Sequence, residues 1–317
     1  MSVSFYIKNK KKLFGYEKVM TVREVIDLYK EYELSFYNID FHSNDPDGEK
    51  FYNTSIECWQ ENHNCILFGV EGKSGRGFEF SYNSTKNSYV IREYTPASEN
   101  DWIVALEFMK VLAEKLNSKI VSEQGDTFTF ETINTFDYKS DIKSGIKVIS
   151  DILNKENEKG FNVDNIYGIK RVVSFNKEII ERIINSSDEI KEFSKFCEDV
   201  QYVDAYSAKQ SFVEDRSMKE KWGYYVLTEN LRTVLPYKPS VEFFSMDYIK
   251  NEEVAFWKIF FCAYKVDENG EEGIDKIGES IYEDFIKKLP TDKYKFIDAS
   301  YIVVEPLNRD DVLEILK

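Results

Sequence analysis

Two neighbouring segments with alternating side chains predict the core of this chain's fold. Residues 78–82 read Phe-Glu-Phe-Ser-Tyr, and after a polar turn residues 88–94 return as a second strand-like segment. Alternation with a period of two places the apolar side chains on one face of a β-strand. Two such strands joined by a short turn pair in antiparallel fashion. We therefore expect an antiparallel sheet with one buried face, which needs other elements to cover it.

The segment that follows has the pattern of an amphipathic helix. Ser98 and Asp101 match a capping box, in which each side chain accepts a hydrogen bond from the other residue's backbone N–H. Apolar residues then recur at helical spacing: Trp102, Ala105, Leu106, Met109, Leu112, Ala113 and Leu116. Further strand-like and helical segments alternate along the chain. We predict an α+β fold of mainly antiparallel sheets with helices packed on one face.

The chain is expected to consist of two similar halves. Residues 155–160 are charged and end in a helix-stopping Gly, so we place the join there, between an N-terminal half (1–155) and a C-terminal half (160–317). Both halves run strand, helix, antiparallel strands, helix, strand, helix. This order suggests an ancient duplication, an idea that unrelated strand connectivities in the two halves would contradict.

The second half contains three further predictions. Residues 222–228 and 233–235 are expected to form a strand pair, and the aromatic segment 254–266 a long strand. A helix is expected from about residue 278 to residue 289.

The net charge of the chain limits the classes of partner that we expect. The chain has 57 acidic and 42 basic residues, a net charge of −15. Phosphate backbones and anionic membranes attract Lys and Arg, so an acidic surface opposes both. The one compact basic run contains Lys8, Lys10, Lys11 and Lys12, and we expect it to form a solvated turn. We therefore expect no nucleic acid and no membrane as partners.

From the sequence we expect neither export nor membrane insertion. No segment approaches the roughly 18–20 apolar residues that span a bilayer. Near the N-terminus the apolar residues precede the lysines, which is the reverse of a signal peptide. The four cysteines form no CxxC motif and are too few for a disulfide framework. We expect a cytoplasmic protein with reduced thiols.

Segments 2–9, 94–102 and 225–237 carry a resemblance to a known family. In these segments the chain resembles an uncharacterised family of cytosolic proteins from low-GC Gram-positive bacteria, a domain of unknown function. The resemblance spans nearly the whole chain and implies a bacterial, full-length domain. It implies no activity and no catalytic residues.

One segment partly matches the motif of a phosphate-binding loop. Gly72-Lys73-Ser74 matches the end of a P-loop, but position 67 is Leu where that motif needs Gly. The motif must also open a helix, whereas residues 78–82 continue as a strand. We expect a hairpin loop here, with weak capture of an anionic ligand by Lys73, Ser74 and Arg76 left as an alternative.

Metal and carboxylate sites have weaker signals. Cys58, His63 and Cys65 supply soft ligands, but their spacing matches no standard zinc motif, so we expect packed thiols, a surface imidazole and no cofactor.

Glu123 and Glu305 follow strands at comparable positions in the two halves. They are candidates for a carboxylate-based active site in a cleft between the halves, although a solvated strand end is the simpler interpretation.

Aromatic residues are unusually frequent, with 24 Phe and 21 Tyr. Too many occur for all of them to be buried, and exposed rings favour protein binding because they offer contact area at low entropic cost. Our leading hypothesis is a non-catalytic binding protein with a basic protein partner, a class that includes immunity-like neutralisation of a toxin. An enzyme is the alternative.

Overall fold

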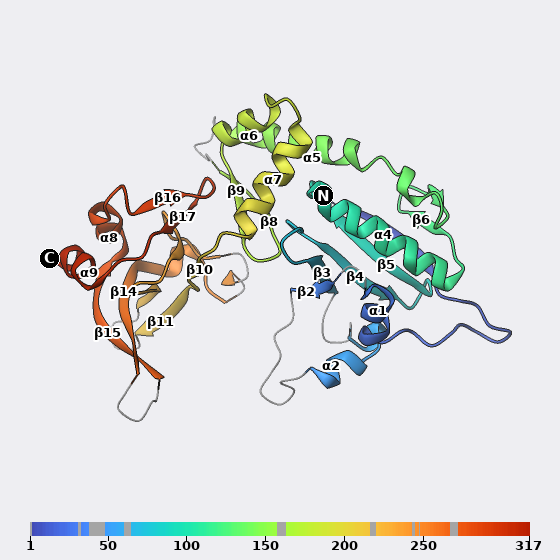
Figure 1. Cartoon of the computed structure of the whole chain (residues 1–317), viewed down its shortest axis with the longest axis horizontal. Coiled ribbons are helices and arrows are strands. Elements are labelled where there is room, and N and C mark those ends of the chain that lie inside the picture. Colours follow the sequence, from blue (N-terminus) through green and yellow to red (C-terminus); the bar gives the residue numbers. More distant parts are fainter. Residues whose placement is uncertain are drawn as a thin grey trace. The chain divides into compact units, whose positions relative to one another are not determined.

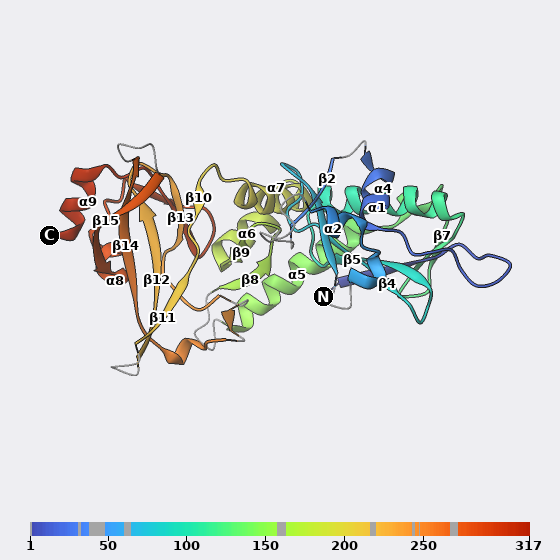
Figure 2. The ribbon, with the colours of Figure 1, turned by 90° about the horizontal axis from the view of Figure 1, so that it is seen from below.

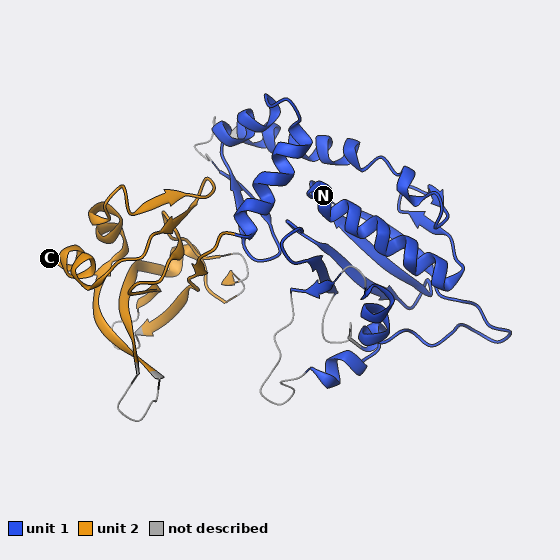
Figure 3. Cartoon of the chain, viewed as in Figure 1, with its two compact units in different colours: residues 1–202 blue, residues 203–317 orange. Residues whose placement is uncertain are grey.

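The computed structural model describes residues 2–30, 33–37, 48–59, 65–156, 163–215, 220–242, 245–246, 248–266 and 272–317 (Figure 1). The chain divides into two compact units, Met1–Tyr202 and Val203–Lys317 (Figure 3). Its sheets are mainly antiparallel and are accompanied by helices, which confirms the predicted α+β class. No described helix is long and apolar enough to cross a bilayer.

The first unit is built on an antiparallel sheet with the order β2-β3-β4-β5-β1-β6-β7, as far as the described residues show. The predicted pair at its centre is confirmed, with Tyr82 opposite Tyr89 and Phe78 opposite Glu93. The strands are β1 (Ser2–Lys8), β2 (Leu34–Phe36), β3 (Ile66–Val70), β4 (Phe78–Asn83), β5 (Ser88–Tyr94), β6 (Ile120–Ser122) and β7 (Thr127–Phe128).

Helix α4 (Glu99–Leu116) lies along one face of this sheet (Figure 1). It begins at the predicted capping box of Ser98 and Asp101, and its predicted apolar residues are buried. Phe108 packs against the rings of Phe78 and Phe80, with both centroids at 5.1 Å. Burial of these rings against the sheet stabilises the contact between α4 and the strands.

Further elements complete the first unit. Helices α1 (Val22–Leu28), α2 (Glu49–Asn53) and α3 (Ile56–Trp59) precede β3. Helices α5 (Tyr138–Glu156), α6 (Lys177–Ile184) and α7 (Glu189–Gln201) follow β7, together with the hairpin of β8 (Asp164–Tyr167) and β9 (Val172–Phe175).

The second unit contains two four-stranded sheets among its described residues, with the orders β11-β12-β14-β15 and β10-β13-β17-β16. Figure 2 shows the long strands β14 and β15. The strands are β10 (Tyr206–Ser207), β11 (Ser211–Asp215), β12 (Glu220–Thr228), β13 (Thr233–Pro236), β14 (Val254–Val266), β15 (Glu272–Ile281), β16 (Tyr294–Phe296) and β17 (Tyr301–Val304). Each sheet contains one parallel pair, β12 with β14 and β10 with β13.

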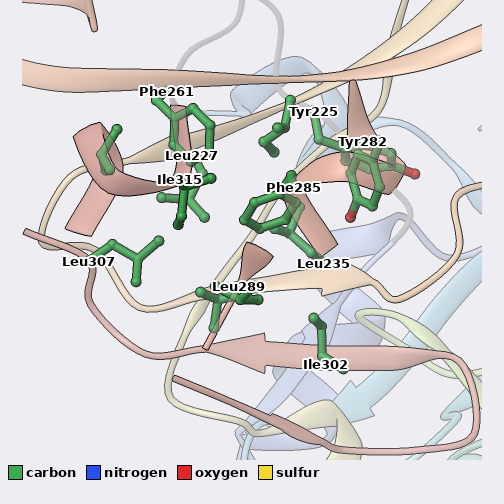
Figure 4. Packing of buried hydrophobic residues seen from close by; sticks show 13 residues of the cluster. Tyr225, Leu227, Leu235, Phe261, Tyr282, Phe285, Leu289, Ile302, Leu307 and Ile315 are labelled. Atoms are coloured by element: carbon green, nitrogen blue, oxygen red, sulfur yellow. The ribbon is translucent and has the colours of Figure 1, made fainter. Parts of the chain in front are cut away.

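One hydrophobic core joins both sheets of this unit to helices α8 (Tyr282–Lys288) and α9 (Arg309–Leu316). Figure 4 shows Phe285 of α8 among side chains that include Leu227 and Leu235, which come from different sheets. Ile315 of α9 joins the same cluster, and Phe285 is fully buried. Truncation of an aromatic core residue costs about 3–5 kcal/mol, so this cluster contributes strongly to the stability of the unit.

Four predictions need correction. The two units divide after Tyr202, so the expected join at 155–160 lies inside the first unit. The strand connectivities of the two units differ, which contradicts the duplication and the two similar halves. Strands β12 and β13 belong to different sheets, so the expected pair does not form. Residues 278–281 continue β15, because they pair with β14, and the helix begins only at Tyr282.

Candidate functional site

The loop between β3 and β4 contains the predicted anion-binding residues. Lys73 is exposed, whereas Ser74 and Arg76 are buried. The Val70 N–H donates a hydrogen bond to Ser74 Oγ at 3.0 Å. The Arg76 guanidinium donates to the carbonyl oxygens of Tyr167 (2.7 Å) and Pro96 (2.6 Å). Two of the three candidate side chains therefore already have partners within the first unit and fix the loop in place.

Asp101 holds the same loop from the start of α4. Its Oδ1 accepts from the Gly77 N–H at 2.9 Å, and its Oδ2 accepts from the Arg76 N–H at 2.9 Å. Oδ2 also accepts from the N–H and the hydroxyl of Ser98. Gly77 has a φ of +66°, and a Cβ there would lie 2.1 Å from the Phe68 carbonyl oxygen. The sequence predicted Asp101 only as a helix cap and missed this second role.

Glu93 is an acidic residue in an apolar environment. It lies on β5 with its side chain fully buried, and neither carboxylate oxygen has a hydrogen-bond partner among the described residues. Burial raises the pKa of Glu93 well above its usual value, Asp101 raises it further, and the Arg76 guanidinium opposes the shift. The sequence contained one signal for the burial of Glu93. In the strand-like segment 88–94, Glu93 lies on the same face as the apolar Ile91, and that face is the one expected to be buried.

Two more carboxyl groups with raised pKa values surround the start of α4. Asp141 of α5 accepts from Thr95 Oγ1 at 3.0 Å, and burial raises its pKa to about 6. Glu198 of α7 accepts from Asn100 Nδ2 at 3.0 Å, and burial raises its pKa to about 7. Glu198 also lines an open cavity of about 470 Å³ beside α7. Groups that titrate near neutral pH inside a cavity are candidates for acid–base chemistry.

The predicted carboxylate pair is not brought together within one unit. Glu123 is exposed and belongs to the first unit, whereas Glu305 belongs to the second. Glu305 forms an ion pair with Arg232, with Oε2 at 3.1 Å from Nε. Each residue has the surroundings of a strand end, as in the simpler interpretation.

The predicted metal ligands are only partly described. Cys58 is exposed, Cys65 is half-buried, and His63 lies outside the described residues. Burial and the neighbouring Glu79 raise the pKa of the Cys65 thiol to about 12, so this thiol is protonated at neutral pH. Among the residues that the structure describes, no three His, Cys, Asp or Glu side chains converge as a metal site.

Aromatic rings gather on one face of the β11-β12-β14-β15 sheet. Trp222 of β12 stacks on Phe256 of β14, with centroids 5.8 Å apart and the ring planes at 11°. Tyr224 packs edge-on against Phe260 at 5.0 Å. All four rings are partly exposed. The opposite face of this sheet supplies buried residues to the core with α8 and α9.

Charged and exposed apolar side chains extend the ring cluster. Lys258 Nζ lies 5.1 Å from the Trp222 centroid, Lys276 Nζ lies 4.6 Å from the Phe260 centroid, and both lysines pair with Glu279. These lysines hold the pKa of Glu279 below its usual value. The apolar surface continues over Tyr264, Ile274 and Ile281, which are 57%, 68% and 41% exposed. We call this surface the aromatic face: Trp222, Tyr224, Phe256, Lys258, Phe260, Tyr264, Ile274, Lys276, Glu279 and Ile281.

Clustered aromatic and apolar side chains at the surface are typical of a protein interface. The sequence predicted exposed aromatics in general, but not these positions. The period-two alternation along β12 and β14 was the signal that could have located them.

Comparisons with known proteins agree with the expected resemblance in its coarse form. No curated protein and no solved structure matches the chain. A family described as a domain of unknown function, DUF4299, matches residues 2–315, almost the full length. The chain therefore belongs to the DUF4299 family.

Proposed function

We propose that this protein is a non-catalytic binding protein and that the aromatic face contacts another protein. The observation that carries the proposal is the group of partly exposed rings and apolar side chains on the sheet face opposite the core, from Trp222 to Tyr264 and Ile274. Such rings lose little conformational entropy on binding, because neighbouring rings already hold them in place. Water released from this surface would drive association.

The overall charge supports a basic partner. A net charge of −15 attracts basic proteins at long range and speeds their encounter. On the aromatic face itself Lys258 and Lys276 share the single carboxylate of Glu279, so this face offers a basic partner no attraction of its own. Steering would therefore come from the whole chain and contact energy from the rings. An immunity-like role, in which the protein neutralises a toxic basic protein, belongs to this class.

Site-specific photo-crosslinking in cells tests the proposal. A photoreactive amino acid is placed at Tyr264, and in a matched control at Tyr248, which is 86% exposed in the same unit. The proposal expects a discrete protein adduct from position 264 only. The partner so identified is then purified and its Kd measured with the double variant Tyr264→Ser/Ile274→Ser.

The double variant is expected to raise Kd by more than about tenfold, while Tyr248→Ser leaves Kd unchanged. Binding of a basic partner should also weaken as salt increases. Adducts of equal yield from both positions, or a Kd that is insensitive to the double variant, would refute the proposal. Both substituted residues are largely exposed, so loss of folding is not expected to confuse the result.

One observation favours a second candidate function, catalysis within the first unit. Glu198 has a pKa of about 7 and lines the 470 Å³ cavity, so it would serve as a general acid or base near neutral pH. This candidate expects an acid–base-catalysed activity whose rate changes near pH 7. The activity should be lost in Glu198→Gln and kept in Glu123→Gln, which changes an exposed carboxylate.

A further inference from the structure

The segment after β1 forms a hairpin that extends beyond the helices and strands of the first unit. It is the dark-blue loop that both Figure 1 and Figure 2 show far from the sheet. Lys11 and Tyr16 form an antiparallel bridge, and the Glu17 N–H donates to the Lys10 carbonyl at 2.8 Å. The Lys12 N–H donates to the Gly15 carbonyl at 3.0 Å, and Gly15 has a φ of +79°. The hairpin therefore has a defined turn, which Gly permits.

Two large apolar side chains occupy the tip of this turn. Leu13 is 93% exposed and Phe14 is 90% exposed, more than any other large hydrophobic residue described. Isolated exposed apolar residues are common, but two adjacent ones at the tip of a projecting hairpin form a compact wedge. Their exposure is costly in water and favourable in an apolar environment.

Cationic side chains surround the wedge. Residues 8–18 contain five lysines and a single acid, Glu17, in a chain whose net charge is −15. All five lysines are exposed. Lys10 pairs with Glu17, but among the described residues Lys11, Lys12 and Lys18 form no ion pair with a carboxylate. The cations of the hairpin are therefore available to an external anion.

A shallow depression of about 640 Å³ lies at the base of the hairpin and is lined in part by lysines. Lys10, Lys12, Lys18 and Lys115 contribute to it. Its acidic residues have partners of their own: Glu17 pairs with Lys10, Glu24 caps α1 through Thr21, and Asp27 pairs with Lys30. With four lysines against three acids, the lining keeps a small excess of positive charge near the wedge.

We propose that this hairpin binds an anionic lipid bilayer, with Leu13 and Phe14 inserted among the headgroups and the lysines on lipid phosphates. Apolar side chains beside lysines are the combination by which interfacial segments bind anionic lipid. The sequence alone predicted a solvated turn and no membrane, because it weighed the charge of the whole chain. At physiological salt the electrostatic effect of a charge is screened over roughly 8 Å. The local charge of the projecting hairpin therefore governs its close contact with a surface, and the net charge of the rest of the chain does not.

A lipid surface fits the hairpin better than a protein does. A stable protein interface buries more than about 1,000 Å² of total surface, which a wedge of two side chains at a narrow turn does not supply. A bilayer needs no complementary pocket, and the unpaired lysines match its phosphates directly.

Vesicle sedimentation tests the proposal with the full chain. Vesicles of phosphatidylcholine alone are compared with vesicles that also contain phosphatidylglycerol. The protein should bind only the anionic vesicles, and binding should weaken with salt. Leu13→Ser/Phe14→Ser should lower the partition coefficient by more than about tenfold, since two apolar side chains lose their insertion. Lys11→Gln/Lys12→Gln should lower it by about fivefold for each lysine.

The matched control is Lys209→Gln/Lys295→Gln, which removes the same charge from exposed positions of the second unit and should leave binding unchanged. As a second readout, brominated lipid should quench the indole introduced by Phe14→Trp more strongly than the native tryptophans. The proposal is overturned if the wild-type protein does not bind anionic vesicles. That is the result expected if the hairpin binds an acidic protein instead of a lipid surface. It is equally overturned if the control variant loses as much binding as the hairpin variants.

Discussion

Replacing Glu93 by Gln should change how the stability of the first unit depends on pH. Glu93 is fully buried and its carboxylate oxygens have no hydrogen-bond partner among the described residues. Burial and Asp101 raise its pKa well above the usual value, as do the more weakly acting Asp141 and Glu79, and only Arg76 opposes them. The folded protein therefore keeps Glu93 protonated under conditions in which the unfolded chain ionises it.

The magnitude follows from proton linkage. A Glu in the unfolded chain has a pKa of about 4.3. Below that pH both states are protonated and Glu93 carries no penalty. As the pH rises towards the folded-state pKa, only the unfolded chain releases the proton, so the free energy of unfolding falls by about 1.4 kcal/mol per pH unit. The wild-type protein loses stability through Glu93 at this rate for as long as the pH lies between the unfolded-state and the folded-state pKa.

Urea unfolding at several pH values measures this effect. The difference in unfolding free energy between Glu93→Gln and wild type should grow by about 1.4 kcal/mol for each pH unit, because Gln does not ionise. Any constant cost of burying the amide cancels in this slope. Asp141 and Glu198 have raised pKa values of about 6 and 7, so they also lower the unfolding free energy as pH rises. They do so equally in wild type and in Glu93→Gln, and their effect cancels in the difference between the two proteins. The exposed control Glu123→Gln should give a parallel profile. Parallel profiles for Glu93→Gln would refute the reasoning.

Two further predictions concern the fold. Asp101→Ala should lower the unfolding free energy by about 3 kcal/mol or more, since it removes a helix cap and leaves two buried N–H groups of the loop unpaired; a loss below about 1 kcal/mol in urea unfolding would contradict this. Gly223→Ala should cost about 1–3 kcal/mol, because its Cβ would lie 2.3 Å from the Trp257 ring. Adding Trp257→Leu should recover part of that loss in thermal unfolding, and additive losses would contradict the clash.

Elements with strong local signals were predicted well. The capping box of Ser98 and Asp101 and the apolar repeat behind it located α4, and alternation located β4 and β5. These features depend on the period of side chains along a single segment, which is visible without knowledge of the rest of the fold.

Elements that depend on distant pairing were predicted poorly. Residues 278–281 were expected to be helical, but Phe261 pairs with Gly278 and the strand continues to Ile281. Strands β12 and β13 follow each other in sequence, yet β12 pairs with β14 and β13 with β17. Strand propensity is weak compared with packing, so long-range partners override it.

The candidate site residues also depend on distant segments, which the sequence pattern does not reveal. Residue types alone pointed to Ser74 and Arg76 as ligand-binding groups, whereas both are buried within the loop that they hold. Glu93 and Glu198 have no motif around them, and their raised pKa values arise from burial by segments far away in sequence. A pKa depends on the local dielectric and the neighbouring charges, which one segment cannot supply.

From its amino acids alone, this chain can be recognised as an acidic α+β protein with identifiable caps and strands, because composition and periodicity are local properties. Strand order, the boundary after Tyr202, the burial of Glu93 and the exposure of Leu13 and Phe14 emerge only when the chain is folded. The physical reason is that burial and exposure are set by which distant segments pack against a residue, and the same Glu or Phe is compatible with either environment.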